Sequence, residues 1–157
     1  MNFEELTAIT PIDGRYRNKV KELELYFSEF ALIKYRVKIE IEYFIALTDL
    51  PLKPLSEFNK KDIPVLRSVY QNFTIDDARK VKGIEKTTRH DVKSVEIFLR
   101  ERFEELNITG VSEFIHFGLT SQDINNTAIP LLLKEAVINI YYPLIGKVMD
   151  RLKELSS

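Results

Sequence analysis

Three segments of the chain begin with the same four-residue pattern, Thr-x-x-Asp, and apolar residues at helical spacing follow. The pairs are Thr74 with Asp77, Thr88 with Asp91, and Thr120 with Asp123. In a capping box, the threonine hydroxyl accepts a hydrogen bond from a backbone N–H of the first helical turn, and the acidic side chain satisfies another N–H. The three pairs therefore predict three helix starts and constrain the chain to a largely helical fold.

An apolar stripe with a spacing of three to four residues also runs through the segment between Phe30 and Leu47. The inner run VKIEIEYF alternates with period two as well, and alone it would indicate a strand. Helix is favoured, because the longer spacing persists across the whole window. A similar stripe follows the second capping pattern from Val92 and stops before Asn107 and Gly110, residues suited to a helix C-terminus. Both stripes predict amphipathic helices.

The third start leads into a long pattern that keeps its spacing to the end of the sequence, with Pro130 and Pro143 expected to kink it. The pattern resembles a helix cut short, and its exposed stripe would need partner helices from another domain or subunit. We expect one all-α domain over residues 1–157, in which the helix at about 120–157 begins a central helical bundle. The stripe residues are Val137, Tyr141, Leu144, Val148, Leu152 and Leu155.

Composition excludes several classes of protein. The chain has 157 residues and no cysteine, which removes disulfides and thiolate metal sites and suits a reducing compartment such as the cytoplasm. The 24 acidic and 23 basic residues nearly cancel, so the basic surface of a nucleic-acid binder is not expected. The N-terminal MNFEELTAITP lacks the features of a signal sequence. The charge-free stretch AVINIYYPLIG is too short to span a membrane.

Two of the predicted helix starts carry side chains that suit an anionic ligand. The stretches are TTRHDVK, residues 87–93, and GLTSQDINN, residues 118–126. Free N–H groups and the positive end of the helix dipole attract anions there. His90 lies at one of these predicted ends, where its ring is a candidate hydrogen-bond partner or base. Two such ends predict a ligand with several negative groups, although plain capping and surface roles explain both patterns too.

Two further motifs have weaker signals. DGRY, residues 13–16, has the composition of a tight turn, and Arg15 and Tyr16 could hold a phosphate from it. Glu113 and His116 have the Glu-x-x-His spacing of di-iron bundles. That site needs a second copy of the motif, so we expect no metal and interpret His116 as a buried, locally bonded histidine.

The motifs TPIDGRY, TTRHDVKSVEIFL and VSEFIHFGLTSQDINN, in this order, resemble the N-terminal portion of the adenylosuccinate lyases, a branch of the fumarase/aspartase superfamily. The resemblance implies a helical N-terminal domain of a cytoplasmic homotetramer that needs no cofactor. It implies release of fumarate by β-elimination from adenylosuccinate, giving AMP, and from SAICAR, giving AICAR, in purine biosynthesis.

The resemblance also implies roles for individual residues. Arg15 and Tyr16 would bind the phosphate end of the substrate. Arg89, His90 and Asp91 would line the pocket, with His90 as the catalytic contributor, while Thr120 and Ser121 would hold a succinyl carboxylate. His116 would belong to the pocket wall. Each of these residues lies within one of the three motifs quoted above.

The Thr-His-Gly motif that carries the family's general acid is absent from the sequence, and so is the Met-Pro-x-Lys-x-Asn signature that carries its serine base. The chain is therefore expected to be an N-terminal fragment that is inactive alone. Two alternatives stay open. Another lyase of the superfamily, such as an argininosuccinate lyase, would share the fold, and a helical interaction module without chemistry would explain the apolar stripe.

Overall fold

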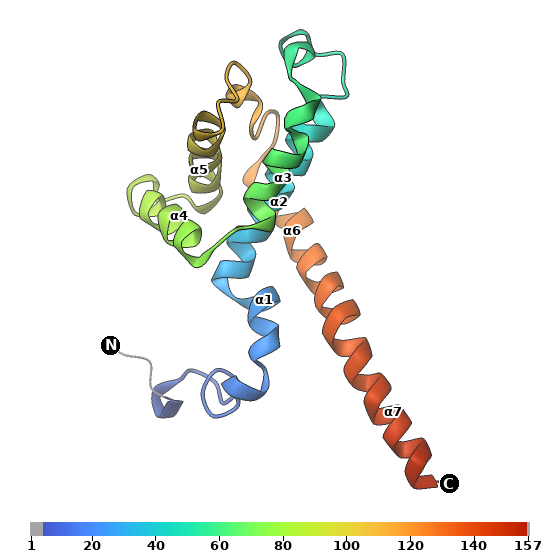
Figure 1. Cartoon of the computed structure of the whole chain (residues 1–157). Helices are drawn as coiled ribbons and strands as arrows, with labels where there is room; N and C mark the ends of the chain where they lie inside the picture. Colours follow the sequence, from blue (N-terminus) through green and yellow to red (C-terminus); the bar gives the residue numbers. More distant parts are fainter. Residues whose placement is uncertain (1–4, 157) are drawn as a thin grey trace. The chain divides into compact units, whose positions relative to one another are not determined.

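Helices make up most of the described part of the chain. The computed structural model describes residues 5–156, except the side chains of residues 5 and 57, and this range contains no strand. Residues 1–4, part of the stretch analysed for a signal sequence, lie outside it. The all-α prediction is confirmed. The α-helices are α1 (Glu24–Phe27), α2 (Glu29–Leu47), α3 (Ile63–Gln71), α4 (Ile75–Thr88), α5 (Asp91–Glu105), α6 (Ser121–Ala136) and α7 (Tyr142–Ser156), with a π-helical segment at Val137–Tyr141 and short 3-10 turns elsewhere (Figure 1).

The segment that could have been a strand forms α2, a helix of 19 residues. The predicted stripe faces the interior, since Ile33, Val37, Ile41 and Phe44 are all at most 2% exposed. The Phe44 ring packs edge-on against the ring of Phe103 in α5, at 5.0 Å between centroids. Edge-to-face aromatic pairs of this kind add roughly 0.5–1.5 kcal/mol to the burial of their area. The helix therefore forms because its apolar positions match the helical period over the longer window.

Helices α4 and α5 form an antiparallel pair. The capping box at Thr74 and Asp77 begins α4, as predicted. Asp77 then pairs with Arg102 of α5, and Lys80 pairs with Glu101 at 2.8 Å. Asp77 and Arg102 lie at equal sequence distances from the corner at Arg89 and His90, as expected for two helices that run back along each other, and the ion pairs tie the two helices together.

The predicted capping box of Thr88 and Asp91 is wrong, although a helix does start there. Thr88 is the last residue of α4, and Arg89 adopts a left-handed conformation with φ +54°. The N-cap residue of α5 is instead His90, which has an extended φ of −146°. Its Nδ1 accepts the backbone N–H of Lys93. The two-residue corner explains the error, because the chain must reverse at Arg89 before the next helix can begin.

The described residues divide into two compact units, one made by residues up to Ala31 with those from Leu132 on, and the other by Leu32–Leu131. In the first unit, the helical run continues through Pro143, and the π-helical segment just before it is the local departure from α geometry. A missing N–H and a ring clash at proline are relieved by such adjustments. The predicted single domain that leads into a central bundle remains a proposal.

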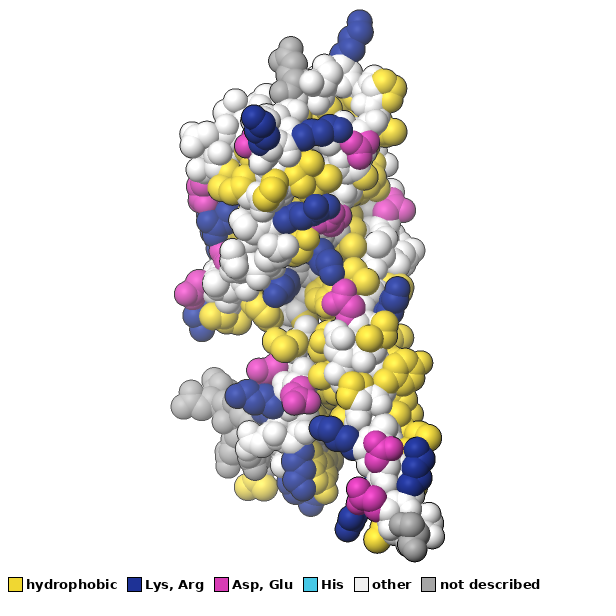
Figure 2. Space-filling view, turned by 45° about the vertical axis from the view of Figure 1, so that its right-hand side comes forward, with side chains coloured by type: hydrophobic (Ala, Val, Ile, Leu, Met, Phe, Trp, Pro, Cys, Tyr) yellow, Lys and Arg dark blue, Asp and Glu magenta, His cyan; other side chains and the backbone are white. Residues whose placement is uncertain are grey.

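The apolar stripe of α7 is exposed, as predicted. Leu144, Val148, Leu152 and Leu155 are 50–70% accessible to solvent, and Figure 2 shows hydrophobic side chains gathered along this helix. By length and composition alone, the run Ser121–Ser156 would also suffice to cross a membrane. Core helices of soluble proteins can meet the same criterion, so the expectation against membrane insertion remains a prediction.

Candidate functional site

The N-terminal ends of α5 and α6 meet at two side chains that were predicted to bind substrate. The Nε2 atom of His90 lies 3.4 Å from the Oγ of Ser121, the first residue of α6. Nδ1 of His90 accepts the backbone N–H of Lys93 at 3.2 Å, so in this arrangement the ring carries its proton on Nε2. The cap therefore turns a defined N–H group of the imidazole toward the start of α6.

The start of α6 is a capping box, as predicted. The Asp123 carboxylate accepts the N–H of Thr120 at 2.8 Å, and the Thr120 hydroxyl accepts the N–H of Asp123 at 3.4 Å. Bonds from the backbone and side chain of Thr120 lower the pKa of Asp123. Thr120 therefore acts as the structural cap of α6, and its hydroxyl lies at the same helix end as the Ser121 hydroxyl.

Arg36 of α2 joins the two helix ends. Its guanidinium donates to Asp91 Oδ2 at 2.6 Å and to Asn125 Oδ1 at 2.9 Å, in α5 and α6 respectively. Burial would raise the pKa of Asp91, but the Val92 N–H and the charge of Arg36 outweigh it and lower the pKa below its usual value. Asp91 was predicted to line the pocket. In the structure its carboxylate accepts a hydrogen bond from Arg36.

His116 lies in the loop before α6 and contacts a side chain of α2. Its Nδ1 is 2.6 Å from Glu40 Oε1, and the Glu40 side chain is fully buried. Burial raises the pKa of Glu40, while the hydrogen bond and the charge of His116 act in the opposite direction. Tyr43, one turn further along α2, donates its hydroxyl to the Phe117 carbonyl at 2.8 Å. The prediction of a local partner for His116 is wrong, because the histidine is only partly buried and its partner Glu40 lies 76 positions away.

The predicted residues fall into two groups. Residues 89–91, 116, 120 and 121 lie in the unit Leu32–Leu131, where the contacts described above link the two helix ends. Arg89 is exposed at the corner between α4 and α5. Arg15 and Tyr16 belong to the other unit.

The DGRY segment forms the predicted turn in its own unit. The N–H of Gly14 bonds to the Thr10 carbonyl at 3.0 Å, and Tyr16 bonds to the Pro11 carbonyl at 2.9 Å. The Arg15 guanidinium stacks on the Tyr16 ring at 4.6 Å from its centroid. Both side chains are exposed, so the turn presents a cation and a phenol to solvent.

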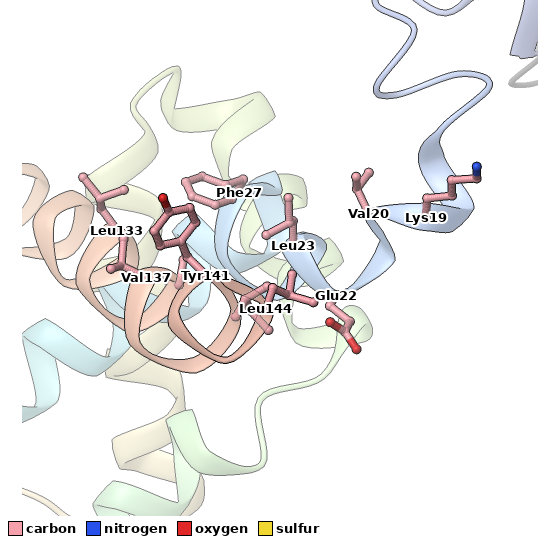
Figure 3. Close-up of a pocket in the computed structure, with 11 residues that line it drawn as sticks. Lys19, Val20, Glu22, Leu23, Phe27, Leu133, Val137, Tyr141 and Leu144 are labelled. Atoms are coloured by element: carbon pink, nitrogen blue, oxygen red, sulfur yellow. The ribbon is translucent and has the colours of Figure 1, made fainter. Parts of the chain in front are cut away.

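One further groove fits a polyanion poorly. An apolar groove of about 330 Å³ lies within the first unit, where Figure 3 shows Phe27, Leu133, Val137 and Tyr141 around it. Its wall offers few charged groups. The Glu113 and His116 pair does not gather ligands either: within residues 5–156, no group of three or more histidine, aspartate or glutamate side chains could hold a metal ion.

Sequence analysis missed four contributors to the site. They are Arg36, Glu40, Tyr43 and Asn125. A signal for two of them was present, since Arg36 and Glu40 interrupt the apolar stripe of α2 at positions where the helical period places buried side chains. Buried charges need partners, so their positions could have predicted buried ion pairs but not which residues answer them.

The chain is similar to curated adenylosuccinate lyases over 99% of its length. It is 52% identical to the adenylosuccinate lyase of Dictyostelium discoideum, 40% identical to that of Escherichia coli K12, and 42% identical to that of Buchnera aphidicola. The aligned part covers 34–35% of these relatives, so the chain spans about a third of their length. The family model described as lyase matches residues 14–157, and the chain therefore belongs to the lyase family.

Proposed function

We propose that the full-length protein containing this chain is an adenylosuccinate lyase, and that the chain supplies part of its substrate site. The observation that carries the proposal is the approach of His90 Nε2 to Ser121 Oγ at the ends of two helices. The similarity to adenylosuccinate lyases along nearly the whole chain supports the same reading. The reaction would release fumarate from adenylosuccinate to give AMP, and from SAICAR to give AICAR.

The substrates carry a phosphate and two carboxylates, which suit a site built from helix N-termini. Thr120 and Ser121 would hold a succinyl carboxylate with hydroxyl and backbone N–H groups. His90 would present its Nε2–H to the substrate, because Nδ1 is occupied by the Lys93 N–H. Arg15 and Tyr16 would bind the phosphate end, and Arg89 would offer a second cation at the pocket.

In the elimination, a base removes a proton beside a carboxylate and negative charge grows on that carboxylate. The carbon–nitrogen bond then breaks, fumarate leaves, and a general acid protonates the departing nitrogen. Hydrogen-bond donors fixed in advance stabilise such charge without reorganising, which is where α6 and Ser121 would contribute. The main general acid and base would come from the rest of the full-length protein. We further propose a cytoplasmic homotetramer without a cofactor, in which partner helices cover the exposed stripe of α7.

Kinetics of the full-length protein test the proposal through Ser121 and Arg15. With Ser121→Ala or Arg15→Ala, we expect KM for adenylosuccinate to rise about tenfold or more, since each change removes a charge-assisted hydrogen bond. Arg17→Ala is the control, because Arg17 is paired with Asp13 at 2.5 Å. Unchanged KM in both site variants would favour a helical module without chemistry.

A further inference from the structure

We infer that Arg36 is a positioning residue that holds His90 and Ser121 at their working separation. The inference rests on the proposed function and extends it to a residue that does not itself face the ligand. Arg36 lies on α2, outside both helix ends, and the guanidinium reaches both. Its side chain is only 7% exposed.

Each partner of Arg36 is tied to one of the two site residues. Asp91 directly follows His90, so the bond from Arg36 restrains the first turn of α5. Asn125 lies four residues after Ser121, on the same face of α6 and one turn further along. The planar fork of Arg36 therefore fixes the two helix starts with respect to each other.

Two more residues of α2 restrain the segment that leads into α6. Glu40 and Tyr43 follow Arg36 by four and seven positions and contact His116 and the Phe117 carbonyl. Glu40 and Tyr43 therefore restrain the loop before α6, whereas Arg36 contacts both α5 and α6. Arg36 is thus the residue of this face whose loss would let the two helix ends separate.

The chemistry of the side chain sharpens the expectation. Guanidinium offers several donors in a rigid plane, and an ammonium group acts as a point charge that matches this geometry poorly. Lysine at position 36 should therefore keep the charge near Asp91 and lose the bond to Asn125. Methionine keeps the volume but leaves Asp91 without its cation, which weakens the restraint on both helices.

The experiment compares Arg36→Lys and Arg36→Met in the full-length protein. We expect kcat/KM for adenylosuccinate to fall about tenfold for lysine and about a hundredfold for methionine, with changes in both kcat and KM. The double variant Arg36→Met with Asn125→Ala should lose no more than Arg36→Met alone, since both changes break the same link.

Arg102→Met is the matched control, because Arg102 also joins two helices, through Asp77, at the far end of α5. It should lower the thermal midpoint while leaving kcat/KM within about twofold of wild type. Wild-type kcat/KM in Arg36→Met, or fully additive losses in the double variant, would overturn the inference. If methionine prevents folding, the lysine variant decides by the same criterion.

A crystal structure of the Arg36 variant separates this inference from the proposed function. We expect the His90 Nε2 to Ser121 Oγ distance to exceed the 3.4 Å of the wild-type chain. An unchanged distance would contradict a positioning role whatever the protein catalyses. Failure of the wild-type protein to release fumarate from adenylosuccinate would instead overturn the proposed function, and the distance would still test the role of Arg36.

Discussion

At the residue scale, His90 combines a structural and a proposed chemical role in one imidazole. Nδ1 caps α5 through the Lys93 N–H, and Nε2 faces Ser121. Loss of an N-cap side chain costs about 1 kcal/mol of stability, while loss of a positioned acid–base group costs about 100-fold or more in rate. The two roles can therefore be separated by the choice of substitution.

In the full-length protein, His90→Ala should reduce both the thermal midpoint and turnover of adenylosuccinate. His90→Asn is the control, because asparagine is a good N-cap that lacks the imidazole. It should restore the midpoint and leave turnover about 100-fold or more below wild type. Turnover near the wild-type rate in His90→Asn would reduce the histidine to a helix cap.

Glu40 predicts an unusual dependence of stability on pH. Burial raises its pKa above the ordinary value of 4.5, and the groups that face it are His116 and Glu96. Between pH 4.5 and the raised pKa, the folded protein binds a proton at Glu40 more tightly than the unfolded chain does. Its contribution to stability is therefore present below pH 4.5 and is lost as pH rises through the folded pKa.

Glu40→Gln stays neutral at every pH and should lack this dependence. Its thermal midpoint, relative to the wild-type midpoint, should rise as pH increases from about 4.5 toward neutrality. Thermal unfolding of the full-length protein and the variant at a series of pH values measures the difference. A difference that stays constant over this range would show that Glu40 ionises normally in the folded protein.

Prediction from sequence succeeded for residues whose role depends on local chemistry. Thr120 and Asp123 form the cap that their spacing predicted, and His90 lies at a helix start as predicted, although it is itself the N-cap residue. The partners of Arg36 and Glu40 could not be predicted, because they lie 55 to 89 positions away and 76 positions away respectively. Such pairs depend on how helices pack, which a helical period does not specify.

At the scale of elements, the caps of α4 and α6 allow a matched comparison. Both helices begin with a Thr-x-x-Asp capping box, but only the one at Thr120 adjoins the proposed site. Thr74→Ala and Thr120→Ala should each cost about 1 kcal/mol of stability. Only Thr120→Ala should also raise KM for adenylosuccinate, because its hydroxyl is proposed to contact the substrate.

Thermal unfolding and steady-state kinetics on the two full-length variants measure both effects. Thr120→Ser keeps a hydroxyl and should recover stability and KM together. Equal KM values in Thr74→Ala and Thr120→Ala would show that Thr120 is a cap and nothing more.

The helix starts also show which part of an element could not be predicted from the sequence. Thr74 and Thr120 cap as their spacing predicts, whereas Thr88 ends α4 and leaves the cap to His90. The difference arises at Arg89, whose left-handed conformation turns the chain within two residues. Sequence spacing does not reveal that turn, because arginine has no preference for positive φ.

At the scale of the whole molecule, the chain covers about a third of the length of its curated relatives, so the activity proposed above is that of the full-length protein. The helical class was predictable from periodicity alone, while the partners of the exposed α7 stripe were not, because a stripe does not specify what covers it.

The 157-residue chain expressed alone should release no fumarate from adenylosuccinate. Fumarate release at the full-length rate by this chain would show that it already holds the acid and base.

The most direct measurement is fumarate release by the full-length protein supplied separately with adenylosuccinate and argininosuccinate. We expect release from adenylosuccinate, with AMP as the second product, and none from argininosuccinate. Release from argininosuccinate alone would assign the site to another lyase of the superfamily. No release from either substrate would contradict the proposed reaction.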